Sequence, residues 1–207
     1  MTEDTGNEGR PDLADQRDVP RIYQPAEDSR LLAETAVEYV DGDDLVLDLG
    51  TGSGYVGRRV AEETGAQVLA SDVSPLACRE AASAGLPVVR GHLLDPVCDG
   101  TVDAVVFNPP YLPTAPDREW DDWMERALSG GESGRAVIEP FLSDLRRVLA
   151  DDGQALLLLS SLTGIEAVRD HARANGLTTM EAASEAYPSE RLVVLHLVPS
   201  RGNYQDA

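Results

Sequence analysis

The stretch "FNPPYLP", residues 107–113, places side chains that could do chemistry directly after the apolar run "VDAVV". Proline donates no backbone hydrogen bond and stiffens its neighbours, so two prolines after a buried strand require a reason. Asn108 offers a side-chain oxygen as an acceptor, and the carbonyl of Pro109 offers a second one in a rigid backbone. Tyr111 adds a flat aromatic face. We interpret the stretch from Asn108 through Pro110 to Tyr111 as a rigid clamp for a planar NH2 group.

Such a clamp would activate a weak nitrogen nucleophile. The lone pair of an amide or of an exocyclic amine is delocalised, and the nitrogen is therefore a poor nucleophile. Two fixed acceptors that hold both hydrogens would turn this lone pair toward an electrophile and favour the pyramidal nitrogen of the transition state. No strong base is required before the attack. The alternative interpretation of the same residues is a purely structural Pro-Pro turn.

A second candidate site is the glycine-rich turn "LDLGTGSGYVG", residues 47–57. Gly50, Gly52 and Gly54 allow a backbone with positive φ and a close approach of a ligand. Asp72 ends the next predicted strand, eighteen residues after Gly54, and suits a carboxylate that accepts hydrogen bonds from ribose hydroxyls. The combination predicts a cofactor that contains a nucleoside.

The residues leave two cofactors open. The turn contains the pattern GxGxxG, ending at Gly57, which is compatible with an NAD-dependent oxidoreductase. Asp48 favours S-adenosylmethionine, because a carboxylate would repel a pyrophosphate and attract the cationic amino acid end of that cofactor. The plainer interpretation of Asp48 is a solvated acid at the end of a strand.

The elements that must position these residues follow from apolar periodicity and from glycine and proline stops. The pattern predicts helices over 26–40, 55–65, 75–85, 134–153 and 164–176, and strands over 44–50, 66–72, 86–91, 102–108, 154–161, 177–186 and 190–199. This alternation indicates an α/β, Rossmann-like fold with a seven-stranded, mostly parallel sheet, and the short final link predicts a C-terminal antiparallel hairpin. We expect a flexible acidic tail over 1–20 and a single domain over 21–207.

The composition is strongly acidic. Seventeen basic residues, all arginine, stand against 37 acidic ones, for a net charge of −20. Because the acids are spread along the chain, we interpret the charge as halophilic adaptation rather than as an acidic docking surface. The charge also argues against nucleic acid as a partner.

No metal site and no membrane segment are expected. Cys78 and Cys98 form no CxxC pair, and the three histidines are scattered in the sequence. The apolar runs are too short to span a bilayer. Acids stand where a secretory signal would carry a basic and then an apolar region, so we expect a cytoplasmic protein.

From about Ile22 onward the sequence resembles the HemK-related class I methyltransferases, and among them the archaeal and eukaryotic release-factor glutamine methyltransferases. The stretch "IYQPAEDSRLL" looks like the N-terminal signature of that branch. "LDLGTGSGYVG", "SDVSP", "FNPPYLP", "GGESGRAVIEPFL" and "ERLVVLHLV" follow in the order of the family. The resemblance implies the class I methyltransferase fold and S-adenosylmethionine as cofactor.

The resemblance also implies roles for individual residues. Cofactor contacts are implied for Ser29, Asp48, Gly50 and Asp72, and substrate contacts for Asn108, Pro109, Pro110, Tyr111 and Leu112, with Asn108 also near the cofactor. The family usually has an acid that accepts from the adenine amino group where this chain has His92, followed by Leu93. Here His92, the neighbouring Asp95 or the backbone would serve instead, or His92 is an ordinary surface residue.

The implied substrate is the glutamine of the GGQ loop in a class I peptide release factor. The implied partner is a small zinc-binding activator subunit that extends the sheet by an edge strand, and "LPVVRG" is the expected edge.

Two enzymatic alternatives and one non-catalytic alternative remain. A nucleic acid base N-methyltransferase would share the clamp, an NAD-dependent oxidoreductase would share the glycine turn, and a cofactor-binding scaffold would share the fold. Trp120 and Trp123 could form a lid or substrate-docking segment, or a helix packed on the domain.

Overall fold

The computed structural model describes residues 25–113 and 130–200. These residues form a seven-stranded sheet with the strand order β3-β2-β1-β4-β5-β7-β6. Strands β1 to β5 run parallel, and β7 runs antiparallel to both β5 and β6. The strands are β1 (Leu45–Leu49), β2 (Gln67–Asp72), β3 (Val88–Arg90), β4 (Val102–Phe107), β5 (Leu149–Ser160), β6 (Leu177–Ala186) and β7 (Arg191–Pro199). The predicted fold and its C-terminal hairpin are confirmed.

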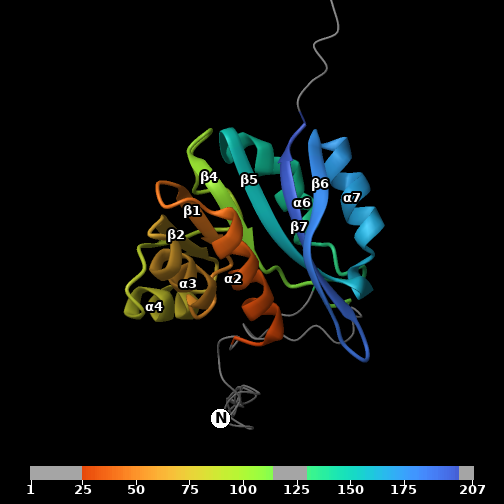
Figure 1. Cartoon of the computed structure of the whole chain (residues 1–207), viewed down its shortest axis with the longest axis horizontal. Coiled ribbons are helices and arrows are strands. Elements are labelled where there is room, and N and C mark those ends of the chain that lie inside the picture. Colours follow the sequence, from red (N-terminus) through yellow and green to blue (C-terminus); the bar gives the residue numbers. More distant parts are fainter. Residues whose placement is uncertain (1–24, 114–129, 201–207) are drawn as a thin grey trace, which may run out of the picture.

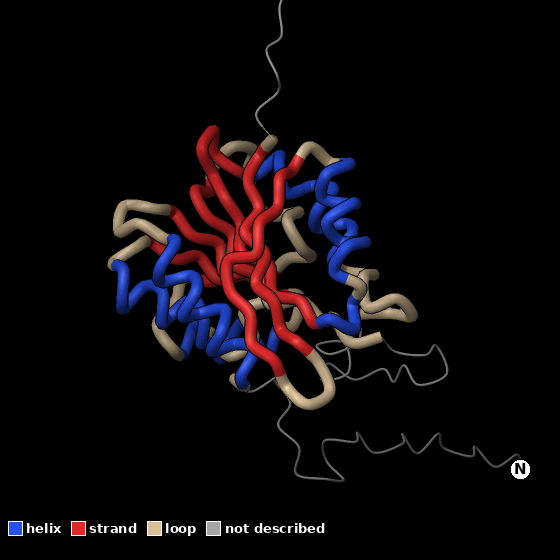
Figure 2. Tube along the Cα trace, turned by 45° about the vertical axis from the view of Figure 1, so that its right-hand side comes forward, coloured by secondary structure: helices blue, strands red, loops and turns tan. Residues whose placement is uncertain are grey.

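Helices cover the sheet on both faces (Figures 1 and 2). The helices α2 (Glu27–Tyr39), α3 (Tyr55–Thr64) and α4 (Pro75–Ser83) pack on one face, and α6 (Ile138–Val148) and α7 (Ile165–Ala174) on the other. The central strands are buried on both sides, and successive residues point to opposite faces. Val46 and Val106 therefore belong to the core under α2, whereas Leu47 and Val105 belong to the core under α6.

The pairing of β1 with β4 brings the two candidate motifs to the same edge of the sheet. Leu49 pairs with Phe107, so the glycine turn and Asn108 both begin one residue later. The ring of Phe107 lies beneath the turn, since a Cβ at Gly50 would come within 3.3 Å of its Cε2 atom. Phe107 also contacts Phe141 of α6 edge-on, with ring centroids 4.8 Å apart.

The predicted helix over 134–153 is wrong at both ends. In the structure α6 begins at Ile138 and ends at Val148, and β5 starts at Leu149. The N–H of Gly100 donates to the carbonyl of Arg147, and the N–H of Thr101 donates to the carbonyl of Val148. These bonds to the segment before β4 end the helix, although the residues that follow have ordinary helix propensity.

The strand β3 is one edge of the sheet, as expected, and consists of only three residues. A short 3-10 helix, η2 (Ser161–Thr163), follows β5 and lies near the clamp. Among the described residues, no helix is long and apolar enough to cross a membrane. The expected tail over 1–20 and the two tryptophans lie outside the described residues.

Candidate active site

The glycine turn after β1 leads directly into α3. Gly50, Gly52 and Gly54 all adopt a left-handed backbone, with φ of 63°, 55° and 82°. This conformation is costly for other residues because their Cβ atom clashes with the backbone. The turn therefore needs the glycines for its own shape.

The buried side chain of Asp48 accepts hydrogen bonds from residues of this turn. Its side chain is only 3% exposed, and its Oδ2 atom accepts from Thr51 Oγ1 at 2.6 Å and from the N–H of Gly57 at 3.0 Å. A Cβ at Gly57 would lie 2.7 Å from the same oxygen. The last glycine of GxGxxG thus lets the helix approach a carboxylate, which explains the pattern without a dinucleotide. Asp48 is not the solvated strand-end acid of the plainer interpretation.

Burial of the Asp48 side chain also raises its pKa above the ordinary value of an aspartate. It raises the pKa of Asp48 to about 6, while the hydrogen bonds from Thr51 and Gly57 act in the opposite direction. The nearby carboxylate of Asp72 raises this pKa further. A cation bound above the turn would oppose both effects.

Asp72 stands at the end of β2, next to the turn. Its Oδ2 atom accepts from the N–H of Gly52 at 3.1 Å, and its Oδ1 atom accepts from the N–H of Ser74 at 2.8 Å. Burial raises the pKa of Asp72 against these two hydrogen bonds. The structure thus brings together Asp48, Asp72 and the glycine turn, as the sequence pattern predicts.

Asn108 follows β4 and has its two side-chain ends in different surroundings. Its Nδ2 atom donates to Asp28 Oδ2 at 3.1 Å and lies 3.5 Å from Ser29 Oγ. Its Oδ1 atom is buried and has no hydrogen-bond partner among the described residues. A buried acceptor without a partner costs about 1–3 kcal/mol. An N–H group of a bound molecule would remove this cost.

The rest of the clamp is held through its backbone. The hydroxyl of Thr163, in η2, donates to the carbonyl of Tyr111 at 3.3 Å, and the N–H of Gly130 donates to the carbonyl of Leu112 at 2.9 Å. Gly134 has a φ of 73°, and a Cβ there would lie 2.6 Å from the Tyr111 carbonyl oxygen. The segment after residue 129 therefore packs closely against the clamp, and Gly134 is required for that contact.

His92 lies in the loop after β3, one residue after Gly91, whose N–H donates to the carbonyl of Asp72 at 3.1 Å. Its side chain is 70% exposed, and its Nδ1 atom lies 3.7 Å from Asp95 Oδ2. The following residue, Leu93, has a φ of 45°. Both residues and Asp95 line a cavity of about 410 Å³ whose other wall is α6, and neither the glycine turn nor Asn108 lines it. A contact of His92 or Leu93 with adenine stays a prediction.

Two residues of this arrangement were not found from the sequence. Asp28 is 5% exposed and contacts both Asn108 and Tyr111, and Thr163 is fully buried and contacts Tyr111. Asp28 lies inside the stretch "IYQPAEDSRLL", which pointed only to Ser29. No local pattern marks Thr163.

Comparison with known proteins places this arrangement in a family. The model of the Methyltransferase small domain matches residues 26–120. The chain is 31% identical over 183 residues to MJ0928 of Methanocaldococcus jannaschii, named as a predicted protein N5-glutamine methyltransferase, and this match covers 86% of the chain and 91% of the relative. It is also 31% identical over 197 residues to the methyltransferase HEMK2 of Mus musculus, covering 86% of the chain and 90% of the relative.

A solved structure agrees with these relatives. It is the Mtq2-Trm112 complex of E. cuniculi, described as responsible for methylation of the eRF1 translation termination factor. The match has a TM-score of 0.73 and 26% identity, and it covers 87% of this chain and all of that one. The chain belongs to the HemK-related class I S-adenosylmethionine-dependent methyltransferases, in the branch that contains archaeal MJ0928 and eukaryotic HEMK2.

Proposed function

We propose that this protein methylates the side-chain nitrogen of the glutamine in the GGQ loop of a class I peptide release factor. The observation that carries the proposal is Asn108 Oδ1, a buried acceptor without a partner among the described residues, at the sheet edge that also holds the glycine turn. A glutamine amide presents the N–H donor that this oxygen lacks.

The residues around the glycine turn fit S-adenosylmethionine. The turn adopts the backbone that a close ligand approach requires, and Asp72 lies where a ribose would be held. Asp48 and Asp72 favour a cationic ligand at this edge of the sheet. Ser29, which lies 3.5 Å from Asn108, would contact the cofactor from α2. When bound, the cofactor supplies a methyl group on a cationic sulfonium.

The clamp would position the amide nitrogen for this methyl group. Asn108 Oδ1 and the carbonyl of Pro109 would each accept one N–H of the amide, so that the planar NH2 group is held by both hydrogens. The side chain of Tyr111 would lie against the flat amide. This arrangement directs the nitrogen lone pair and requires no strong base near the clamp, because the proton can leave after the nitrogen becomes cationic.

The relatives support the same substrate and a partner. MJ0928 carries the name of an N5-glutamine methyltransferase, and the E. cuniculi complex is described as methylating a translation termination factor. That complex contains the activator Trm112. We therefore propose that a small zinc-binding activator of this kind pairs with the exposed edge β3 of the present chain.

The test is a methyl-transfer assay in high salt with labelled S-adenosylmethionine and a purified class I release factor, with and without the activator. We expect label on the wild-type factor and none on a factor whose GGQ glutamine is changed to alanine. We also expect the Asn108→Ala variant to bind the cofactor in a calorimetric titration but to transfer label far more slowly than wild type, at a low rate that can still be measured.

Other outcomes would overturn defined parts of the proposal. Equal label on both factors would exclude the GGQ glutamine as the acceptor. Full transfer by Asn108→Ala would exclude the clamp. Absence of transfer to any release factor, together with normal cofactor binding and transfer to a nucleic acid, would replace the glutamine by an exocyclic base amine.

A further inference from the structure

Asp28 joins the two parts of the clamp from a distant position in the sequence. It lies in the first turn of α2, eighty residues before Asn108, and is 5% exposed. Its Oδ2 atom accepts from Asn108 Nδ2 at 3.1 Å and from the hydroxyl of Tyr111 at 3.2 Å. No other described carboxylate contacts either of these side chains in the structure.

We infer that Asp28 is a positioning residue, which fixes the orientation of the Asn108 amide and of the Tyr111 ring for methyl transfer. This inference rests on the proposed function, because it assigns the residue that prepares the same clamp.

The orientation of Asn108 follows from the chemistry of its neighbour. The two ends of an asparagine amide have nearly the same shape, so sterics alone leave the side chain free to present either oxygen or NH2 to a substrate. The Oδ2 atom of Asp28 accepts hydrogen bonds, and it therefore selects the orientation with NH2 toward Asp28 and Oδ1 away from it. The opposite orientation would place two oxygens together and would present a donor to the donors of a substrate amide.

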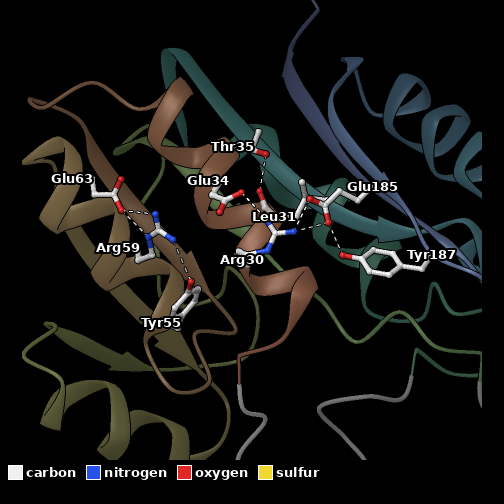
Figure 3. A network of polar contacts seen from close by, with 9 residues as sticks. All are labelled: Arg30, Leu31, Glu34, Thr35, Tyr55, Arg59, Glu63, Glu185 and Tyr187. Atoms are coloured by element: carbon white, nitrogen blue, oxygen red, sulfur yellow. Dashed lines mark hydrogen bonds and ion pairs between the residues drawn. The ribbon is translucent and has the colours of Figure 1, made fainter.

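The structure also holds Asp28 itself in place. Its Oδ1 atom accepts from the N–H of Ser29 at 2.6 Å and lies 3.3 Å from Ser29 Oγ. The beginning of a helix favours a negative charge. Two residues after Asp28, in the same turn, Arg30 contacts Glu185 of β6 at 2.6 Å, and Glu185 also accepts from Tyr187 (Figure 3). The ion pair ties the first turn of α2 to the C-terminal hairpin.

A double-mutant cycle tests whether Asp28 acts through Asn108. Methyl transfer is measured at saturating cofactor for wild type, Asp28→Ala, Asn108→Ala and the double variant, using the release factor and activator described above. We expect Asp28→Ala to lower kcat roughly 10²-fold, since displacement of a positioning group by about 1 Å has an effect of that size. In the Asn108→Ala background the same substitution should change kcat less than about two-fold.

The matched control is Glu27→Ala, which removes the neighbouring acid from the same first turn of α2. Glu27 is exposed, so this variant reproduces the loss of negative charge at the helix end without touching the clamp. We expect it to retain wild-type kcat. Equal losses in Glu27→Ala and Asp28→Ala would attribute the effect to the helix end and overturn the inference, as would independent, multiplicative effects of Asp28→Ala and Asn108→Ala.

A second measurement does not depend on the substrate. The chain contains four asparagines, so selective ¹⁵N labelling of asparagine gives few side-chain signals, and the signal of Asn108 is the one lost in Asn108→Ala. In wild type we expect its NH2 protons to exchange slowly with water, because one of them is bound to a buried carboxylate. Asp28→Ala should accelerate this exchange and Glu27→Ala should not.

The two measurements separate the inference from the proposed function. An Asn108 signal that is unchanged in Asp28→Ala would overturn the positioning role whatever the enzyme methylates. A wild-type enzyme that leaves the release factor unlabelled would overturn the proposed substrate, while an altered Asn108 signal in Asp28→Ala would still establish that Asp28 orients the clamp.

Discussion

At the scale of single residues, the site is built from buried carboxylates with different tasks. Asp48 was expected to face the cationic end of the cofactor, but its Oδ2 atom is occupied by Thr51 and by the N–H of Gly57. Asp72 bridges the turn and the start of α4 through Gly52 and Ser74. Both acids therefore stabilise the glycine turn through these hydrogen bonds. Any electrostatic attraction between their carboxylates and a ligand is additional to that structural role.

The buried charge of Asp48 should make stability depend on pH. Because the pKa of Asp48 is raised to about 6 in the folded protein, its contribution is favourable at low pH and is lost as the pH rises through about 6. The difference from the ordinary value corresponds to about 3 kcal/mol. Asparagine keeps an oxygen that can accept from Thr51 and Gly57 but carries no charge.

We therefore predict that Asp48→Asn stabilises the cofactor-free protein relative to wild type at about pH 7.5, and does so less at about pH 4.5. Denaturant unfolding of both proteins at the two pH values measures the difference. Asp43→Asn, on an exposed position of the same region, is the control and should show no such pH dependence. A constant difference between wild type and Asp48→Asn across this range would contradict the buried-charge argument.

Among the elements, β3 is the edge of the sheet at which we propose that the activator binds. It has three residues, and within the described parts of the chain it pairs only with β2, through the carbonyl of Pro87 and the N–H of Gly91 among others. Residues alternate along a strand, so the backbone N–H of Val88 points away from β2. An added strand would use this N–H.

We predict that Val88→Pro preserves the fold and weakens binding of the activator at least tenfold. Proline is tolerated on an edge strand where its missing N–H faces solvent, so the pairing with β2 should survive. Val88→Thr is the matched control, because threonine is also β-branched and keeps the N–H. Circular dichroism checks the fold, and co-purification with the activator checks the binding. If Val88→Pro folds and binds the activator as well as Val88→Thr does, the partner uses another surface.

At the scale of the whole molecule, the net charge of −20 is the dominant property. Ion pairs such as Arg59–Glu63 and Arg147–Asp144 offset only part of the acidic charge. Salt shortens the Debye length from about 10 Å at 0.1 M to about 3 Å at 1 M and thereby screens the repulsion among the remaining acids.

We predict that the unfolding temperature rises by several degrees between about 0.1 M and about 2 M KCl. The control is a variant in which Asp41, Asp43 and Asp151, all exposed, are replaced by asparagine. This variant should be more stable than wild type at low salt and should respond less to added KCl, because it has less repulsion to screen. Calorimetric scans of both proteins at the two KCl concentrations measure the unfolding temperatures. Identical salt responses would show that the effect of KCl is unrelated to the surface acids.

The order of the elements and the two motifs of the site could be predicted from the sequence alone. Apolar periodicity and the glycine and proline stops are local signals, and they were sufficient to predict seven strands and the helices between them. The identity of Asn108 and its prolines also indicated an NH2 clamp without any structural information. These features could be predicted because each depends on residues close together in the chain.

Features that depend on contacts between residues far apart in the chain could be seen only in the tertiary structure. The end of α6 at Val148 is set by hydrogen bonds from residues 100 and 101, and no local pattern contains that information. The orientation of Asn108 depends on a carboxylate eighty residues earlier, which reaches it only because α2 packs across the sheet. Partners so far apart in sequence leave no periodic signal, and only the packed molecule brings them within hydrogen-bond distance.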